Sequence, residues 1–407
     1  MPSVDELVVT AAMLIPTLVN LRDFAKRYAT HFLRSEQREH AVTYLEGLLS
    51  DLPRKTIEPI AMAHDQARRP LQRFVGAGKY DDESLLRELK AHVTEKLGDP
   101  AGVFIIDPSC FEKKGTESVG VARQWNGRIG KVDNCQKGVF LAYAAPNGTT
   151  IVDRRLYLPA SWASNGLLRG KCHVPSDVEF HESWKLAIDM IDASKEMPHS
   201  WVVADDEFGR SGEFRTALRD RNERYALDVP GNTLVRLRLA RQPRGGRRRN
   251  GPVMRADKWA KEQKGGAWVR VLLRDGTKEP HYVLAASAVV ETRVHGKFRL
   301  KERLIVVKTI GPAPEIKYIL SNAEVAIAIG EVVCAAGTRH SIEESFLAGK
   351  GESGLRHYEV RSWVGWHHHM TLSLMAGWFL VLECHHLKKN TADDCAADRE
   401  GSCTSVA

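Results

Sequence analysis

The amino-acid sequence predicts a mixed α/β protein with an α-helical N-terminal region and a β-rich insertion. Three observations support this fold class: helical periodicity up to about residue 98, two short apolar runs that each end in aspartate, and a change to strand-like patterning after residue 230. The chain has 407 residues, of which 43% are hydrophobic and 27% are charged. This length and composition are typical of a folded protein with two or three domains.

The first 98 residues carry a helical pattern, and we assign them to a separate domain. Apolar side chains recur at steps of three and four, as at Leu18, Leu21, Phe24, Tyr28 and Phe32. Lysine and arginine residues lie between them, and the whole chain has a formal net charge of +8. Such charges fit either a solvated helical surface or a helical DNA-binding domain, because nucleic acid is the usual polyanionic partner of a basic protein.

Residues 99–229 are predicted to form the first part of an α/β core. The apolar run 102–107 ends at Asp107, and a second run, 201–205, ends at Asp205, as buried central strands do. Further strands are predicted at 119–124, 138–143, 151–158 and 225–229, and a helix at 177–195. The Asn126-Gly127 and Asn147-Gly148 pairs predict tight turns between strands.

Residues 230–320 are predicted to be an arginine-rich and β-rich insertion, with strands at 269–273, 281–287 and 304–308. Seven arginines crowd its beginning: Arg236, Arg238, Arg241, Arg244, Arg247, Arg248 and Arg249. The segment is either a solvated loop or a clamp on the DNA backbone, which would relieve the mutual repulsion of the cations.

Residues 321–390 are predicted to complete the core with helices, and residues 391–407 to form a disordered tail. The apolar stripe from Val360 to Leu382 is interpreted as core. His367, His368 and His369 are not expected to bind one metal ion, because adjacent helical residues point about 100° apart.

The seven cysteines are scattered without a Cys-x-x-Cys pair, so neither a zinc ribbon nor a disulfide framework is indicated. Acidic residues precede the apolar part of the N-terminus, which is the reverse of a signal peptide. The apolar stretch 370–382 is too short to span a bilayer. These features predict a cytoplasmic protein without a membrane segment.

Asp107 and Asp205 suit phosphodiester chemistry, because carboxylates at the ends of rigid strands hold hard divalent cations. Either one alone could be a turn former or a helix cap. Asp206 and Glu207 adjoin Asp205 and are alternatives to it, although alternation along a strand lets only one neighbour face the site.

A third carboxylate, Glu343, follows on a predicted helix. Arg339, Glu343 and Lys350 are spaced so that they lie close to one helix face, with the acid between two cations. A surface ladder of ion pairs has similar spacing. The two preceding strand-end aspartates favour the functional interpretation.

This Arg339-x3-Glu343-x6-Lys350 pattern resembles the arginine-glutamate-lysine signature of DDE transposases, although Ala336 stands where the signature usually has tyrosine. Over nearly its whole length the chain resembles the insertion-sequence 701 family of these transposases. The resemblance rests on the segments FIIDPSCFEKKG, SVGVARQWNGRIGKVDNCQKGVFLAY, RLYLPASWA, VVADDEFG, RHSIEESFLAGKGESGLRHYEVRSW and GWHHHMTLSLMA.

The resemblance implies a ribonuclease-H-like catalytic core interrupted by the β-rich insertion. It implies that Asp107, Asp205 and Glu343 are the catalytic acids and bind two Mg²⁺ ions, for which Mn²⁺ can substitute. The implied activity is cleavage of transposon ends and joining of the 3′-OH to target DNA. The implied partners are double-stranded DNA, as terminal inverted repeats and target, and a second copy of the chain in the DNA complex.

Further DNA contacts are expected from Arg339 and Lys350, by likeness to the signature. Trp162 is a candidate for stacking on a flipped base, with a core tryptophan as the alternative. Basic and polar residues after the first catalytic strand are placed to contact phosphates, without individual assignment: Lys113, Lys114, Arg123, Gln124, Arg128 and Lys131.

Two other functions fit the same sequence. One is a catalytically silent or domesticated DNA-binding protein or repressor. The other is a nuclease that cuts without joining, because a fold alone does not define the reaction.

Overall fold

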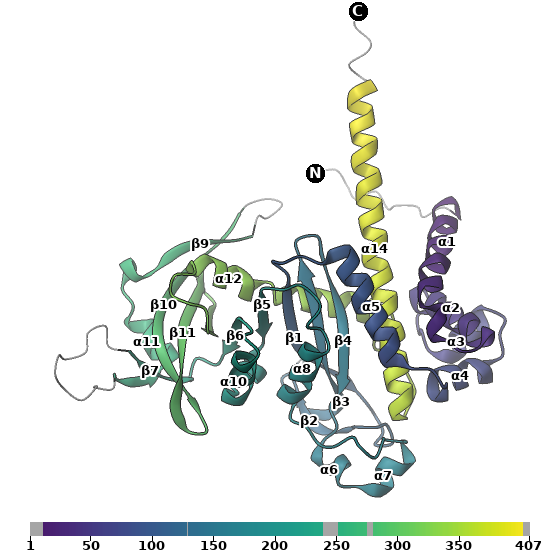
Figure 1. Ribbon diagram of the computed structural model, residues 1–407, viewed down its shortest axis with the longest axis horizontal. Helices are drawn as coiled ribbons and strands as arrows, with labels where there is room; N and C mark the ends of the chain where they lie inside the picture. The colour runs from purple at the N-terminus through teal and green to yellow at the C-terminus, as the bar shows by residue number, and fades with distance from the viewer. Residues whose placement is uncertain (1–10, 128, 239–250, 275–279, 402–407) are drawn as a thin grey trace, which may run out of the picture.

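The computed structural model describes residues 11–127, 129–238, 251–274, 280–401 of the chain. The strands in this part of the chain join in one 12-stranded mixed sheet with the order β2-β3-β1-β5-β6-β12-β11-β10-β7-β8. Strand β4 pairs with β3 and strand β9 pairs with β10 outside this path. Figure 1 shows the sheet running from the helical half of the molecule into the insertion.

One half of the sheet holds the strands that carry the predicted acids. They are β1 (Val103–Glu112), β2 (Ala122–Asn126), β3 (Lys131–Ala145), β4 (Gly148–Leu156), β5 (Trp201–Ala204) and β6 (Tyr225–Val229). Strands β1, β5 and β6 are parallel to one another, whereas β3 is antiparallel to β1 and β4. This mixed arrangement is consistent with the ribonuclease-H-like fold that the resemblance implies.

The other half of the sheet comes from the insertion: β7 (Leu234–Leu237), β8 (Val253–Arg255), β9 (Val269–Arg274), β10 (His281–Val294), β11 (Lys297–Thr309) and β12 (Ile316–Ser321). Strand β12 pairs with β6, so the insertion extends the sheet. It also has its own small core, in which Trp259 of α11 (Ala256–Glu262) packs with Val290 and Leu304. The tight β10–β11 turn uses positive φ angles at His295 and Gly296, 47° and 75°.

The N-terminal region is helical, as the periodicity predicts: α1 (Ala11–Tyr28), α2 (Ser35–Leu49), α3 (Ile57–Ala63), α4 (Arg68–Ala77) and α5 (Asp82–Leu97), with a short 3₁₀ turn η1 (Ala29–His31). These helices share one hydrophobic core with the sheet and with α14 (Trp363–Gly401), rather than closing a core among themselves. Figure 1 shows α14 passing between α1 and α2 on one side and the sheet on the other. The separate domain ending at residue 98 stays a prediction.

The remaining helices lie around the sheet. They are α6 (Ala160–Ala163), α7 (Gly166–Lys171), α8 (Ser183–Asp192), α9 (Asp206–Gly209), α10 (Gly212–Asp220), α12 (Ile329–Gly337), α13 (His340–Gly351) and the 3₁₀ turn η2 (Gly265–Ala267). Helix α8 packs on β3 and β4, and α13 contacts both β4 and α14. Helix α14 continues to Gly401, into the region predicted to be a disordered tail, and residues 402–407 lie outside the described residues.

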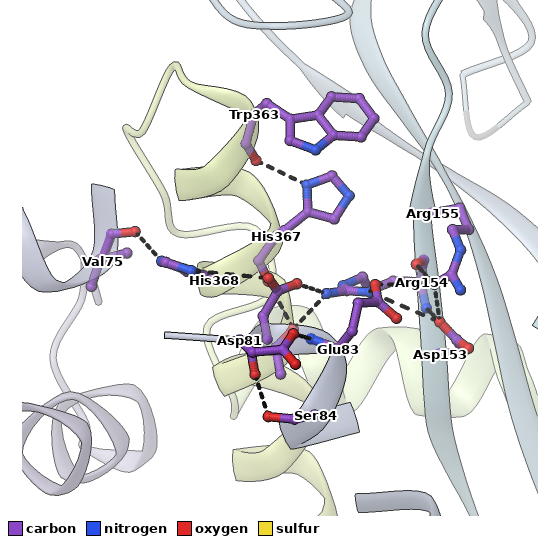
Figure 2. Close-up of polar contacts among 12 residues, drawn as sticks. Val75, Asp81, Glu83, Ser84, Asp153, Arg154, Arg155, Trp363, His367 and His368 are labelled. Atoms are coloured by element: carbon purple, nitrogen blue, oxygen red, sulfur yellow. Dashed lines mark hydrogen bonds and ion pairs between the residues drawn. The ribbon is translucent and has the colours of Figure 1, made fainter. Parts of the chain in front are cut away.

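A buried ionic cluster joins α5, β4 and α14 (Figure 2). Arg154 on β4 is fully buried, and its guanidinium pairs with Asp82 and Glu83 at the start of α5 and with the Thr371 hydroxyl 3.0 Å away. Burial opposes ionisation of Asp82, but Arg154 brings its pKa below the ordinary value. The cluster therefore fixes α5 against the sheet by charge as well as by packing.

The three adjacent histidines of α14 are buried, and each has its own hydrogen-bond partner. Nδ1 of His367 lies 2.9 Å from the Trp363 carbonyl oxygen, and Nδ1 of His368 lies 3.1 Å from that of Val75 (Figure 2). His369 lies 2.9 Å from the hydroxyl of Tyr44. Within the residues that the structure places, none of the helices combines the length and hydrophobicity needed to cross a lipid bilayer.

Candidate active site

The parallel pairing of β1 with β5 brings two aspartates to the same edge of the sheet. Ile106 of β1 is paired with Ala204 of β5. Asp107 follows Ile106 in the sequence, and Asp205 follows Ala204. The hydrophobic runs that precede them are buried, which fixes both strand ends. The strand-end geometry predicted from the sequence is therefore present.

Asp205 also caps a helix, which was the alternative interpretation. Its Oδ1 accepts hydrogen bonds from the backbone N–H groups of Glu207 and Phe208, at 3.0 and 3.4 Å. The cap orients the carboxylate, and it leaves the second carboxylate oxygen available. Capping and ligand binding are thus compatible at this residue.

The two acids that adjoin Asp205 are each paired with a cation. Asp206 contacts Arg210 at 2.5 Å, and Glu207 contacts Lys137 of β3. All three acids line the same cleft, and Asp205 is the one of them for which no ion pair with a cation is found in the described part of the chain.

Gly209 determines how closely α9, the short helix after Asp205, approaches the sheet. A β-carbon on Gly209, at the end of α9, would lie 1.8 Å from the carbonyl oxygen of Asp228 on β6. Any larger residue would push α9 away from β6 and would move Asp205 with it. The glycine that ends the VVADDEFG segment therefore has a structural reason.

Glu343 comes from α13 and reaches the same cleft as the aspartates. Its carboxylate lies 3.1 Å from Nη2 of Arg339 and 3.3 Å from Nδ1 of His340, and its side chain is 48% exposed. The cleft has a volume of about 1190 Å³. Its lining includes Asp107, Asp205, Glu343, Lys137, Arg210, Lys350, Arg356, Trp125 and Leu347. The structure thus brings the three predicted acids to one site.

Arg339 lies among the acids rather than in open solvent. Its guanidinium contacts Asp107 at 3.4 Å, Asp228 at 3.1 Å and Glu343 at 3.1 Å. Burial works against its charge, but Asp228 and then Asp107 and Glu343 raise its pKa. The positive charge at the centre of the site is therefore supplied by the protein itself.

Both aspartates have raised pKa values. Burial, followed by the nearby Asp205 carboxylate, raises the pKa of Asp107 to about 8. Burial, followed by Glu207, raises the pKa of Asp205 to about 6. Arg339 lowers both pKa values without cancelling these effects, so both carboxyl groups keep their protons to a higher pH than an ordinary aspartate does.

The donor set suits a hard divalent cation, because its groups are carboxylate oxygens. In the described part of the chain, no group of three His, Cys, Asp or Glu side chains is arranged to hold a metal ion. In this arrangement the carboxylate of Glu343 is directed to Arg339 and His340. The acids fit the chemistry of the ion, while Arg339 provides the counter-charge.

The interpretation of Trp162 as a base-stacking residue is wrong. Its side chain is 3% exposed, and its Nε1 donates a hydrogen bond to the Val121 carbonyl oxygen at 2.7 Å. A satisfied and buried indole offers no face to DNA. Trp162 is a core residue.

The arginine-rich segment is only partly described. Arg236 lies on β7, not in a loop, and it contacts Glu291 at 3.3 Å and the Phe298 ring at 4.2 Å. Arg238 follows β7 and is exposed, and its backbone N–H bonds to Val289. The other five arginines, Arg241, Arg244, Arg247, Arg248 and Arg249, lie outside the described residues.

Three residues of the site were missed in the sequence. Asp228 lies on β6, which is a third apolar strand with an acid near its end, so the same pattern could have found it. Lys137 and Trp125 lie on the β2–β3 hairpin, and their place in the cleft depends on the pairing of β3 with β1, an earlier segment of the chain. No local pattern marks them.

Comparison with known proteins identifies the family of this chain. Residues 27–280 match the family model described as DDE superfamily endonuclease. This range includes Asp107 and Asp205 and ends before Glu343.

The chain is also similar to a probable transposase for insertion sequence element IS701 from Microchaete diplosiphon. The two are 26% identical over 237 residues, which is 56% of this chain and 58% of the relative. The match thus spans little more than half of the relative's length. Because the family model covers more than half of the chain, this protein belongs to the DDE endonuclease superfamily.

Proposed function

We propose that this protein is a DNA transposase that binds transposon ends, cleaves them and joins the freed 3′-OH to target DNA. The observation that carries the proposal is the adjacency of Asp107 and Asp205 at one sheet edge, in the cleft that Glu343 also lines. Family membership and the similarity to a probable transposase support the same activity.

Asp107, Asp205 and Glu343 would hold two Mg²⁺ ions, and Mn²⁺ would be able to replace them. Bound there, the ions would supply an activated oxygen nucleophile and neutralise the charge that develops on the phosphate. The carboxylate oxygens that these three residues bring to one cleft support this assignment.

The chain's own residues have further roles in the proposed reaction. Arg339, Lys350 and Arg356 would bind DNA phosphates, since all three are at or beside the acids. Asp228 would position Arg339 by the ion pair between them. The rigid ends of β1 and β5 would keep the acids oriented during in-line displacement.

Double-stranded DNA is the proposed partner, as terminal inverted repeats and as target. The seven arginines from Arg236 to Arg249 are proposed as a backbone clamp, although Arg236 is already paired with Glu291. Pairing of two transposon ends would require a homodimer in the DNA complex. The protein is proposed to act in the cytoplasm, on the bacterial nucleoid.

A second candidate function is a nuclease that cuts DNA without joining it. The description of the matching family as an endonuclease favours this alternative. The two functions share the acids and differ in whether the freed 3′-OH attacks a second DNA. A catalytically silent DNA-binding protein is disfavoured, because all three acids are retained in one cleft.

The test is a product assay with a plasmid that carries the genomic DNA flanking the coding sequence on both sides. In Mg²⁺ the wild-type protein should yield both cleaved ends and joined products. Asp107→Asn should lose both while still binding the DNA, because the first metal-binding carboxylate is removed. Asp192→Asn is the matched control and should remain active. Asp192 ends α8 and forms an exposed ion pair with Arg221.

Strand transfer by Asp107→Asn at the wild-type level would overturn the catalytic assignment. Cleaved products without joined products would support the nuclease instead.

A further inference from the structure

An exposed tryptophan lines the cleft that contains the acids. Trp125 on β2 is 60% exposed, whereas a large aromatic side chain is usually mostly buried. Leu347 on α13, 77% exposed, lines the same cleft. Apolar surface on a site that otherwise contains charged residues indicates a ligand with both apolar and charged parts.

The indole of Trp125 is mounted on a rigid element. Strand β2 pairs with β3 from Ala122 to Asn126, and Trp125 faces Val132 across the ladder. The Cys110 thiol on β1 lies 3.6 Å from the Trp125 carbonyl oxygen, and the next residue, Asn126, is fully buried. The backbone on both sides of the indole is therefore fixed, while its ring is exposed.

Cations line the same cleft as this aromatic surface. Lys350 and Arg356 line the cleft with Trp125. Arg123 is exposed, and because side chains alternate along a strand it shares a face of β2 with Trp125. An aromatic ring among cations is the arrangement that binds unpaired nucleotides, with phosphates on the cations and a base on the ring.

We propose that Trp125 is the stacking platform for an unpaired DNA base next to the scissile phosphate. The inference rests on the proposed function and names the part of the DNA that this cleft would bind. Stacking tolerates any base, because each base has a π face, so Trp125 would recognise an opened strand end rather than a sequence. Trp162, the candidate for this role in the sequence, is buried and cannot perform it.

The test compares two duplexes of the same sequence, one blunt and one with a short unpaired 3′ end that carries the fluorescent base 2-aminopurine. Binding is measured without divalent ions, so that no cleavage occurs. Wild-type protein should quench 2-aminopurine by stacking. Trp125→Ala should lose the quenching and bind the unpaired-end duplex about 5- to 100-fold more weakly, with unchanged affinity for the blunt duplex.

Trp125→Phe should restore most of the quenching, because it keeps an aromatic face. Trp184→Ala is the matched control: Trp184 is a partly exposed tryptophan on α8 that does not line the cleft, and its replacement should leave both affinities unchanged. Melting temperatures of the variants establish that each one is folded.

Three results would overturn the proposal. They are unchanged quenching in Trp125→Ala, an equal loss of affinity for both duplexes, or an effect on self-association with DNA binding intact. The proposed function is tested separately, by measuring whether the Asp107→Asn variant has lost DNA cleavage. An inactive Asp107→Asn together with a neutral Trp125→Ala would remove only the stacking role.

Discussion

Nε of Arg339 lies 3.1 Å from Oδ2 of Asp228, and this ion pair holds the guanidinium beside Asp107 and Glu343. Both partners are mostly buried, with side chains 19% and 20% exposed. Arg339 is thus anchored at one end by an acid outside the predicted triad. Asp107 and Glu343 contact the two terminal nitrogens of the same guanidinium.

Asp228→Asn should weaken divalent-ion binding. The substitution removes one negative charge from the cluster and leaves Arg339 to pair more strongly with Asp107 and Glu343. Both effects oppose a cation, and we expect the Mg²⁺ concentration for half-maximal cleavage to rise about tenfold, or about 1.4 kcal/mol. A Mg²⁺ titration of cleavage checks this, with Asp257→Asn at an exposed ion pair as control. An unchanged half-saturation point would contradict the positioning role.

Asp107 should make the metal-free protein less stable as pH rises. Its pKa is about 8 in the folded chain, against an ordinary value of 3.8, so between these values the folded state holds a proton that the unfolded state has lost. The stabilisation is complete below the unfolded pKa and is lost as pH rises through the folded pKa. One proton contributes a slope of at most about 1.4 kcal/mol per pH unit.

Other groups titrate in the same range, so the measurement is the difference between wild type and Asp107→Asn. Urea unfolding in the presence of a chelator, from about pH 5 to pH 8, should show a smaller decline for the variant. Parallel curves for the two proteins would show that Asp107 does not take up the proton.

Arg154→Ala should destabilise the fold strongly. Removing the fully buried guanidinium leaves Asp82 and Glu83 without their shared partner, and breaking a buried ion pair costs about 3–5 kcal/mol. Because Glu83 is 48% exposed and regains water, we expect about 3 kcal/mol. Arg68→Ala, at an exposed pair with Glu58, should cost less than about 1 kcal/mol in the same denaturation assay. Equal losses for the two variants would contradict the role of the cluster.

Trp162→Ala should lower stability without a specific effect on DNA. The buried indole fills core volume, and such a truncation costs about 3–5 kcal/mol. Chemical denaturation measures the loss, and affinity for the two duplexes should fall only in proportion to the unfolded fraction. A stable Trp162→Ala variant with selectively impaired DNA binding would restore the stacking interpretation of that residue.

Replacing the seven arginines from 236 to 249 by alanine should flatten the salt dependence of DNA binding. Removing one cation that neutralises a phosphate reduces the slope of log K against log salt by about 0.9. Arg236→Ala alone should leave the slope unchanged, because Arg236 is paired with Glu291 on the insertion strands. Affinity measured over a range of salt concentrations checks both, and an unchanged slope for the full replacement would exclude the clamp.

Much of the strand arrangement was predictable because local patterns determine it. The runs ending at Asp107 and Asp205 are buried strands, and the Asn126-Gly127 and Asn147-Gly148 turns separate strands as predicted. The ends of elements were less accurate. The helix predicted from residue 177 begins at Ser183, and the strand predicted from residue 119 begins at Ala122.

The remainder depends on tertiary contacts that no window of sequence contains. Exposure separates Trp125 from Trp162, yet both lie among small and polar residues in the sequence. The position of Arg236 depends on Glu291, which lies opposite it on the neighbouring strand β10. Asp228 lies near the end of an apolar strand, which is the pattern of the other two aspartates, but only the pairing of β5 with β6 places it beside Asp205.

The shared core of the N-terminal helices and α14 has a consequence for synthesis. Tyr44 and His369 are hydrogen-bonded partners separated by 325 positions. The face of α2 that packs on α14 therefore stays uncovered until α14 leaves the ribosome, although α1, α3 and α4 also contact α2. Nascent chains should therefore expose this face to chaperones throughout translation of the sheet. Products that terminate early should be degraded rather than persist as small DNA-binding fragments.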